Sequence, residues 1–458
     1  MLFHTWIFLI FFVLFYAVFL LIKRTRFREP WLLVSSYVFY GWWNPLYLLL
    51  IVWSTVIDYV SVTFMDRSRR RKLWLTLSII NNLFLLSLFK YGPFITENLN
   101  LLLTRIGIPL TLPAPGVLLP VGISFYTFQS MSYTIDFYRG KIDKEKSFIR
   151  FATFVSLFPQ LVAGPIERAK NLLPQLKDKP SISSRDIGDG LSLFVVGLFK
   201  KIALADYLAL YVDRVFDVPG LFDGPALLLA TFAFSWQIYF DFSGYTDMAR
   251  GIGRMLGIRL MLNFNNPYLA DGLGDFWKRW HISLSTWFKD YVYIPLGGNR
   301  KSKLFTYRNM VLAMLISGLW HGAAWMFVFW GALHALGRIA TRELERSEFY
   351  RHKIPRIVKQ AVTFSFVSFA WIFFRAASLD DAFIIIRRIF GMAWSDPRFP
   401  LLMLLMILSI WFYQFLYESK FRIFLQLSAV KIALVVVMIL YMIFFVSSGN
   451  LPFIYFQF

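Results

Sequence analysis

The chain has 458 residues, of which 58% are hydrophobic and 16% are charged, and its mean hydropathy is +0.57. Soluble proteins carry about 25% charged residues, so this composition excludes a soluble globular protein and predicts a helical membrane protein. The net charge of +21 lies in short basic clusters between apolar runs, a pattern of cytoplasmic loops rather than of nucleic-acid binding. With no cysteine, disulfides, thiolate metal sites and a cysteine nucleophile are excluded.

Four apolar runs predict N-terminal membrane spans, over residues 3–22, 31–43, 47–64 and 73–89. A basic cluster follows the first run, which predicts an uncleaved helix with its N-terminus outside. The turn Trp42-Trp43-Asn44-Pro45 suits the outer membrane interface. The weakly polar stretch that continues to Pro115 is expected to be an external or re-entrant connection.

The run over residues 117–137 differs from these spans because polar side chains recur along it. Polar groups need hydrogen-bond partners in hydrocarbon, so this helix is expected to be buried among others or to line a wet cavity. Tyr126 and Gln129 are the candidate lining residues. Alternatively, the hydroxyl groups bond back to their own helix or to neighbouring helices.

Residues 151–162 are too short to span a membrane and precede the basic residue Arg168, so we expect a re-entrant or interfacial segment on the cytoplasmic face. A span over residues 191–212 contains Lys200 and Lys201. A lipid-facing helix tolerates such charges only by snorkelling, so the pair is expected near the head groups or inside the bundle.

A further span over residues 226–240 leads into a polar and aromatic stretch in which Asp241 and Tyr245 are candidate channel residues. From residue 249 to 308 basic residues recur without a run of spanning length, which predicts the main cytoplasmic surface. Asn265, within this surface, is another candidate for the site.

Residues 275–289 have a helix-type pattern, with Asp275 as the expected N-cap. One face of this helix would be aromatic and apolar and the opposite face basic, as in a helix at a membrane surface. The apolar face would carry Trp277, His281, Leu284 and Phe288. His281 is therefore a candidate site residue, although a lone histidine on an apolar face is more often packed than reactive.

Residues 309–338 are longer than one span and shorter than two, with basic clusters at both ends. A helix pair broken at His321-Gly322 or a strongly tilted span would fit, and the break is favoured. Small residues near His321 would allow close backbone approach. The neighbouring candidates for a channel are Ser317, Trp320 and Trp325.

About 18 Å of helix would separate Asn309 from His321, which places this imidazole near the middle of a hydrocarbon core about 30 Å thick. A charged group there costs about 2.5–3.5 kcal/mol and usually faces a cavity with a chemical task. The alternative is a neutral histidine that is hydrogen-bonded in the bundle and has only a structural role.

Two histidines without cysteine or an obvious carboxylate companion are poor evidence for a metal, so no metal site or bound cofactor is expected. General-base chemistry fits better: a neutral imidazole takes the proton of a hydroxyl that attacks an activated acyl carbonyl. The second histidine would orient the donor or stabilise charge. Basic residues suited to coenzyme A phosphates are Arg168, Lys278, Arg279, Arg300 and Lys301.

The last predicted spans cover residues 361–374, 401–416 and 431–445, and an amphipathic segment over 380–390 is expected at a surface. The fold class is therefore all-α, a polytopic bundle of roughly 11–14 membrane helices, some of them re-entrant or interfacial. Neither a repeat nor a linker is evident, so one domain over residues 1–458 is expected. Its parts are 1–115 (N-terminal spans), 116–341 (catalytic core) and 342–458 (C-terminal spans).

The chain resembles the membrane-bound O-acyltransferase family, and within it the bacterial alginate O-acetyltransferase branch. The resemblance rests on Pro120–Gln129, Phe158–Arg168, Tyr239–Asp247, Asn263–Tyr268, Asp275–Trp287, Ile294–Asn299 and Gly318–Trp325. These stretches extend over most of the chain, and the last three are the most specific. Over residues 1–115 and 345–430 mainly hydropathy agrees.

The resemblance implies helices around a funnel that closes on His321, the residue usually assigned as catalytic, with His281 as the second family histidine. It also implies transfer of acetyl groups from cytosolic acetyl-CoA toward an extracytoplasmic polysaccharide, in the cytoplasmic membrane of a bacterium and with extracytoplasmic partner proteins. Whether His321 acts as a base or carries the acyl group stays open.

Two other functions fit the same residues. A related transferase would move D-alanine to teichoic acid or acetyl groups to peptidoglycan. A transporter or scaffold, from a different class, would use its histidines for proton coupling or for packing alone.

Overall fold

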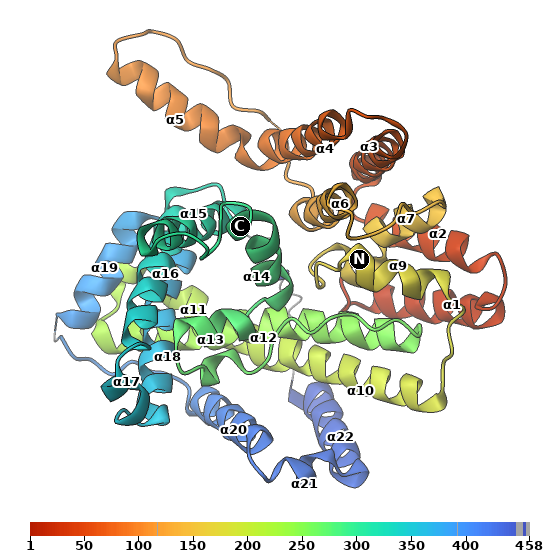
Figure 1. Cartoon of the computed structure of the whole chain (residues 1–458). Coiled ribbons are helices and arrows are strands. Elements are labelled where there is room, and N and C mark those ends of the chain that lie inside the picture. The colour runs from red at the N-terminus through yellow and green to blue at the C-terminus, as the bar shows by residue number, and fades with distance from the viewer. Residues whose placement is uncertain (117, 392, 446–451, 455–458) are drawn as a thin grey trace. The chain divides into compact units, whose positions relative to one another are not determined.

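The structure is a computed structural model that describes residues 1–116, 118–391, 393–445 and 452–454, and these residues form helices and no strands (Figure 1). The prediction of an all-α fold is therefore confirmed. Val117, where one span was expected to begin, lies outside the described residues. The chain divides into two compact units, residues 1–191 with 249–261 and residues 192–248 with 262–458. A single domain over the whole chain stays a prediction.

Within the described residues, five helical stretches are long and apolar enough to cross a membrane, which supports the membrane character of the protein. They are Pro45–Arg67, Arg71–Arg105, Arg356–Arg375, Leu401–Glu418 and Ser428–Phe445. In the last of these, α22 (Ser428–Phe445), no residue is buried, and its many exposed aliphatic and aromatic side chains suit contact with lipid. The number of membrane helices and the orientation of the N-terminus stay predictions.

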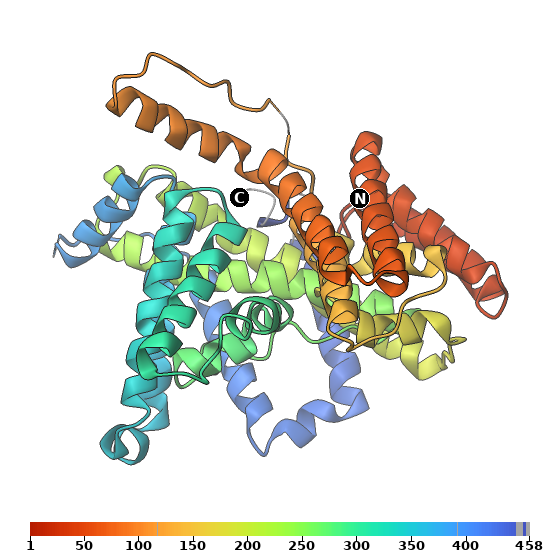
Figure 2. The same ribbon diagram turned by 45° about the horizontal axis from the view of Figure 1, so that its top comes forward.

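Unit 1 consists mainly of helices from the first part of the chain. They are α1 (Trp6–Ile22), α2 (Arg28–Gly41), α3 (Leu48–Arg67), α4 (Arg71–Leu86), α5 (Gly92–Arg105), α6 (Ile123–Tyr138), α7 (Phe148–Ser156), α8 (Phe158–Leu161) and α9 (Ala169–Lys177). Two helices, α10 (Ser184–Phe199) and α12 (Gly224–Met255), run from one unit into the other. The chain after α5 runs back alongside it (Figure 2), where Asn100 exchanges two hydrogen bonds with the backbone of Leu112.

The polar helix α6 is buried against α3 and α4. Its Ser130 donates a hydrogen bond to Asp58, a fully buried carboxylate that also accepts from Ser78 at 2.6 Å and Asn82 at 3.0 Å. The predicted burial of this helix is confirmed. Ser130 agrees with the alternative explanation of its polar residues, in which hydroxyl groups form hydrogen bonds to neighbouring helices.

One expectation for unit 1 was wrong. The helix expected to end at residue 89 continues through the π-helical turn Ser87–Tyr91 into α5, so a connection to Pro115 begins only after Arg105. The side chains of Phe151, Phe154 and Phe158 are fully buried, and the re-entrant or interfacial placement of residues 151–162 stays a prediction.

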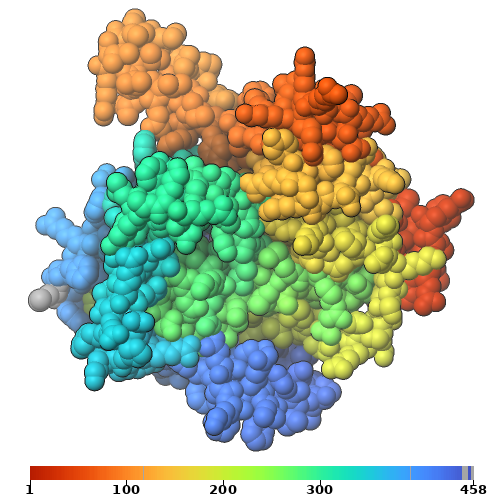
Figure 3. Space-filling view, in the orientation of Figure 1, coloured from red at the N-terminus to blue at the C-terminus, as the bar shows by residue number. Residues whose placement is uncertain are grey.

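Unit 2 carries the remaining helices and both candidate histidines. Its helices are α11 (Asp206–Phe216), α13 (Leu273–Arg279), α14 (Ile282–Phe288), α15 (Lys303–His321), α16 (Trp325–Leu344), α17 (Glu348–His352), α18 (Arg356–Arg375), α19 (Leu379–Phe390), α20 (Leu401–Glu418), α21 (Arg422–Gln426) and α22. The last three, in blue, form one edge of this unit (Figure 3). Helix α12 runs on past residue 240, where a span was expected to end, as far as Met255.

Helices α15 and α16 form an antiparallel hairpin, and α18 packs against α16. Glycines make the close contact inside the hairpin possible. A Cβ atom on Gly318 would collide with the carbonyl group of Phe327, and one on Gly331 would collide with that of Met314. The close backbone approach expected near His321 is confirmed.

Candidate active site

His321 is the last residue of α15, at the point where the hairpin turns. The next residue, Gly322, is extended with φ −160° and ψ 148°, and α16 begins at Trp325. The predicted break at His321-Gly322 is therefore confirmed. The end of α15 places backbone carbonyl groups near His321, and a helix C-terminus stabilises positive charge on a side chain.

Aromatic rings surround the His321 imidazole, which is 4% exposed. The ring centroids of Trp320, Trp330 and Phe374 lie 5.0, 5.1 and 5.3 Å from that of His321. Phe374 comes from α18 and is held by Phe327 at 5.0 Å. These rings fix the imidazole and exclude bulk water, which strengthens electrostatic interactions at this point.

His281 lies between two short helices rather than inside one long helix. It adopts the left-handed conformation, with φ 42° and ψ 55°, between α13 and α14. The prediction of one helix over residues 275–289 was wrong, and Asp275 lies in the first turn of α13, whose N-cap is Gly272. The apolar face predicted for that helix does not exist as such, because the chain turns at His281.

The protonation of His281 follows from its contact with Asn263. The amide oxygen of Asn263 accepts the backbone N–H of Ser283 at 3.1 Å, which fixes it as an acceptor. It also lies 3.2 Å from Nδ1 of His281, so Nδ1 carries the proton and Nε2 the lone pair. Burial lowers the pKa of His281 to about 3, so the imidazole is neutral at physiological pH.

Trp320 contacts both histidines. Its ring centroid lies 5.0 Å from that of His321 and 6.1 Å from that of His281. On the other side, Phe242 of α12 packs edge-on against His281 at 4.6 Å. The two histidines, 40 positions apart in sequence, thus share one aromatic wall.

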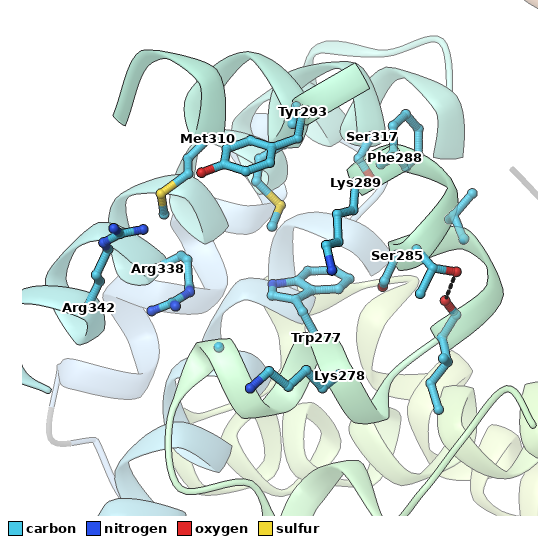
Figure 4. A pocket seen from close by; sticks show the side chains of 16 residues that line it. Trp277, Lys278, Ser285, Phe288, Lys289, Tyr293, Met310, Ser317, Arg338 and Arg342 are labelled. Carbon is cyan, nitrogen blue, oxygen red and sulfur yellow. Dashed lines mark hydrogen bonds between the residues drawn. The ribbon is translucent and has the colours of Figure 1, made fainter. Parts of the chain in front are cut away.

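An apolar cavity of about 420 Å³ lies in the same unit, and its lining residues include neither histidine nor Trp320. Ser317, one turn before His321, and Trp277 line it together with residues of α14 and α15 (Figure 4). Four basic side chains also line it, from Lys278, Lys289, Arg338 and Arg342. The cavity therefore combines apolar walls with positive charge.

A second, polar cavity of about 430 Å³ shares Gly274, Lys278 and Arg338 with the first. Its other basic residues are Arg279, Arg351 and Lys359. Gly274 gives Arg338 room to pass, because a Cβ atom at Gly274 would lie 2.8 Å from its guanidinium group. The two cavities adjoin where Arg338 lies, and each has a volume typical of a small-molecule site.

The predicted site residues fall into three groups. Those at the two cavities are Ser317, Trp277, Lys278 and Arg279. Those elsewhere in unit 2 are His281, Trp320, His321, Asp241, Tyr245, Asn265, Arg300, Lys301 and Trp325. Those in unit 1 are Tyr126, Gln129 and Arg168. Arg279 is already paired with Asp275 at 2.8 Å and Glu418 at 2.7 Å, which makes it less available to a ligand than Lys278.

Sequence reasoning missed Asn263, Phe374, Arg338 and Arg342. Asn263 stands in the same motif as the predicted Asn265, whose backbone N–H instead donates to the carbonyl of Arg279 at 2.9 Å. Arg338 and Arg342 are four residues apart, and that helical spacing was the available signal. Among the described residues, no group of three or more histidine, aspartate or glutamate side chains could hold a metal ion.

The chain matches a family described as "MBOAT, membrane-bound O-acyltransferase family" over residues 138–379. It is 42% identical to "Probable alginate O-acetylase AlgI" of Pseudomonas aeruginosa over 83% of this chain and 74% of that one. It is 39% identical to "Peptidoglycan O-acetyltransferase" of Helicobacter pylori over 81% and 75%. It is 27% identical to "Teichoic acid D-alanyltransferase" of Bacillus subtilis over 62% and 76%.

Proposed function

Because this chain belongs to the membrane-bound O-acyltransferase family, we propose that it moves acetyl groups from cytosolic acetyl-CoA to hydroxyl groups of an exported, alginate-like polysaccharide. The observation that carries the proposal is the apolar cavity with basic side chains that reaches Ser317, one helical turn from His321. The similarity to proteins named as alginate O-acetylases supports the polymer.

The two cavities suit the two halves of coenzyme A. The apolar cavity would take the pantetheine arm, and the phosphates would meet Lys278, Arg338 and Arg342, since phosphates pair well with guanidinium groups. Lys278 and Arg338 line both cavities. They would therefore contact coenzyme A where its nucleotide joins the pantetheine arm. Arg300 and Lys301, which line neither, have no role in this arrangement.

His321 would act as the general base. Its imidazole takes the proton of the acceptor hydroxyl while the hydroxyl oxygen forms a bond to the acetyl carbon. The carbon–sulfur bond then breaks, and the imidazolium returns its proton to the coenzyme A thiolate. The C-terminus of α15 stabilises the imidazolium, and the amides at the start of α16 suit the negative charge on the carbonyl oxygen.

His281 is suited to positioning rather than to proton transfer. A group with a pKa of about 3 is a weak base near neutral pH, and its proton on Nδ1 is held by Asn263. Its contact with Trp320 would instead orient the wall against which the acetyl group lies.

Polysaccharide and coenzyme A are both too polar to cross hydrocarbon, so the reaction would join the two sides of the bacterial cytoplasmic membrane. Extracytoplasmic partner proteins would complete the transfer to the polymer. D-Alanyl transfer to teichoic acid and acetyl transfer to peptidoglycan are the alternatives, favoured by the similarity to proteins of those names.

The test uses the purified protein in liposomes with donor and acceptor on opposite sides. We expect label from acetyl-CoA to reach an alginate-type oligosaccharide, or its partner protein, across the membrane. A D-alanyl carrier protein or a peptidoglycan fragment is offered in parallel. Label from acetyl-CoA that stays with coenzyme A, while D-alanine is transferred, would refute the proposed donor.

A further inference from the structure

A small charged cavity lies in unit 2 outside both cavities of the active site. Its walls come from the π-helical segment Lys200–Ala205, from α11 and α12, and from Pro452 and Ile454. Its volume is about 10 Å³, at the lower limit for a single water molecule. The walls include Lys201, Asp206, Gln237 and Asp241.

The charges around this cavity do not balance. Lys201, whose side chain is 4% exposed, lies 2.8 Å from a carboxylate oxygen of Asp206 and 2.8 Å from one of Asp241. One ammonium group therefore faces two carboxylates. The other nearby charges are already paired, Lys200 with Asp247 at 2.6 Å and Asp213 with Arg375 at 2.7 Å. One negative charge is left over in a buried position, which is costly without a counter-ion.

Two oxygen atoms at this cavity have no hydrogen-bond partner within the part of the chain that the structure describes. They are Oδ2 of Asp206 and Oε1 of Gln237, and the Gln237 residue is only 8% exposed. Oδ2 of Asp241, by contrast, accepts the backbone N–H of Ile454 at 2.6 Å. Buried polar atoms without partners are uncommon in native proteins and call for a specific explanation.

We propose that this cavity binds a single small monovalent cation, Na⁺, through oxygen atoms of Asp206, Gln237 and Asp241. The excess of one negative charge matches one monovalent ion. A divalent ion would be repelled by Lys201, and Mg²⁺ keeps several waters for which a cavity of about 10 Å³ has no room. The ligands are oxygen atoms, the type that hard cations prefer.

One ligand of the cation, Asp241, is adjacent in sequence to a residue that packs against His281. The cation site itself does not depend on the proposed function. Asp241 precedes Phe242, whose ring packs edge-on against His281 at 4.6 Å. An ion held by Asp241 would therefore stiffen the part of α12 that supports His281. The same ion would join α11 to α12, because Asp206 and Gln237 come from these two helices.

The experiment measures the thermal unfolding midpoint of the purified full chain by tryptophan fluorescence, in NaCl, KCl or N-methylglucamine chloride at equal ionic strength. We expect a saturable rise of about 2–4 °C specific to NaCl. Gln237→Met removes the oxygen at nearly constant volume and should abolish the rise. Gln237→Glu adds a second excess charge and should lower the half-saturating Na⁺ concentration by about tenfold or more.

The matched control is Gln414→Met, which removes a buried glutamine of α20 that does not line this cavity. Its midpoint is expected to respond to Na⁺ as that of the unaltered chain does. Equal midpoints in all three salts would overturn the proposal, and a protonated carboxyl group or a water molecule would then explain the cavity. A Na⁺ effect that persists in Gln237→Met would also overturn it. Should Gln237→Met fail to fold, the half-saturating Na⁺ concentration of Gln237→Glu tests the proposal instead, and an unchanged value would overturn it.

Discussion

The surroundings of the two histidines of the site differ although a single tryptophan ring contacts both. His321 ends a helix and packs among aromatic rings, one helical turn from Ser317 in the wall of the apolar cavity. His281 is fully buried at a left-handed kink, with its Nδ1 proton directed at Asn263. We therefore expect the two histidines to have different roles in the proposed reaction, because their environments differ.

In the proposed reaction, this difference would make one imidazole reactive and keep the other neutral. A helix that ends inside the protein provides backbone dipoles for a transient charge, whereas a kinked loop provides hydrogen bonds that hold one tautomer. The second arrangement needs a residue that tolerates positive φ, which most side chains do not. We therefore expect substitutions of His321 and His281 to change turnover and stability in different ways.

The largest effect is expected at His321. His321→Ala should lower the turnover of acyl transfer by about 10³-fold or more, because a general base contributes about 10²–10⁴-fold and its removal also disturbs the aromatic wall. In cells, the acetyl content of the exported polymer should fall nearly to zero at normal expression of the variant. Wild-type acetylation in this strain would show that His321 has only a structural role.

At His281 two variants separate conformation from chemistry. Asn tolerates the left-handed region, so His281→Asn should fold normally and lower turnover by about tenfold. His281→Ala should also lower the unfolding midpoint, since a non-glycine residue without a helpful polar group costs about 1–2 kcal/mol there. Turnover, the Michaelis constant for the donor and the midpoint are measured for both. Full turnover in His281→Asn would show that His281 has no role in the reaction.

Arg338 tests whether the two cavities hold one donor. Arg338→Ala should raise the Michaelis constant for acetyl-CoA by about tenfold with little change in turnover, because charge-assisted hydrogen bonds contribute about 1.5–3 kcal/mol each. Arg300→Ala is the matched control, because this exposed arginine lines neither cavity. An equal rise in both variants would indicate general electrostatic attraction instead of a defined site.

Much of the site could be predicted from sequence where the signal is local. The break at His321 follows from Gly322 and from basic clusters at both ends of an apolar stretch. The kink at His281 could not be predicted, since a histidine in the left-handed region leaves no pattern and the helical spacing on both sides continues through it. Arg338 reaches Gly274 only through the packing of α16 on α13, which no local pattern encodes.

The smallest effect concerns pH and stability. The pKa of His281 is about 3 in the folded chain and about 6.5 in an unfolded one, so below pH 6.5 only the unfolded state takes up the proton. This histidine therefore leaves stability unchanged above about pH 6.5 and reduces it by about 1.4 kcal/mol for each pH unit between there and about pH 3. His281→Asn should show a shallower fall of the unfolding midpoint from pH 7 to pH 5. His352→Asn, at an exposed histidine of α17, should keep the slope of the unaltered chain. Equal slopes in all three proteins would mean that His281 is solvated, and the contrast between the two histidines would then not rest on burial.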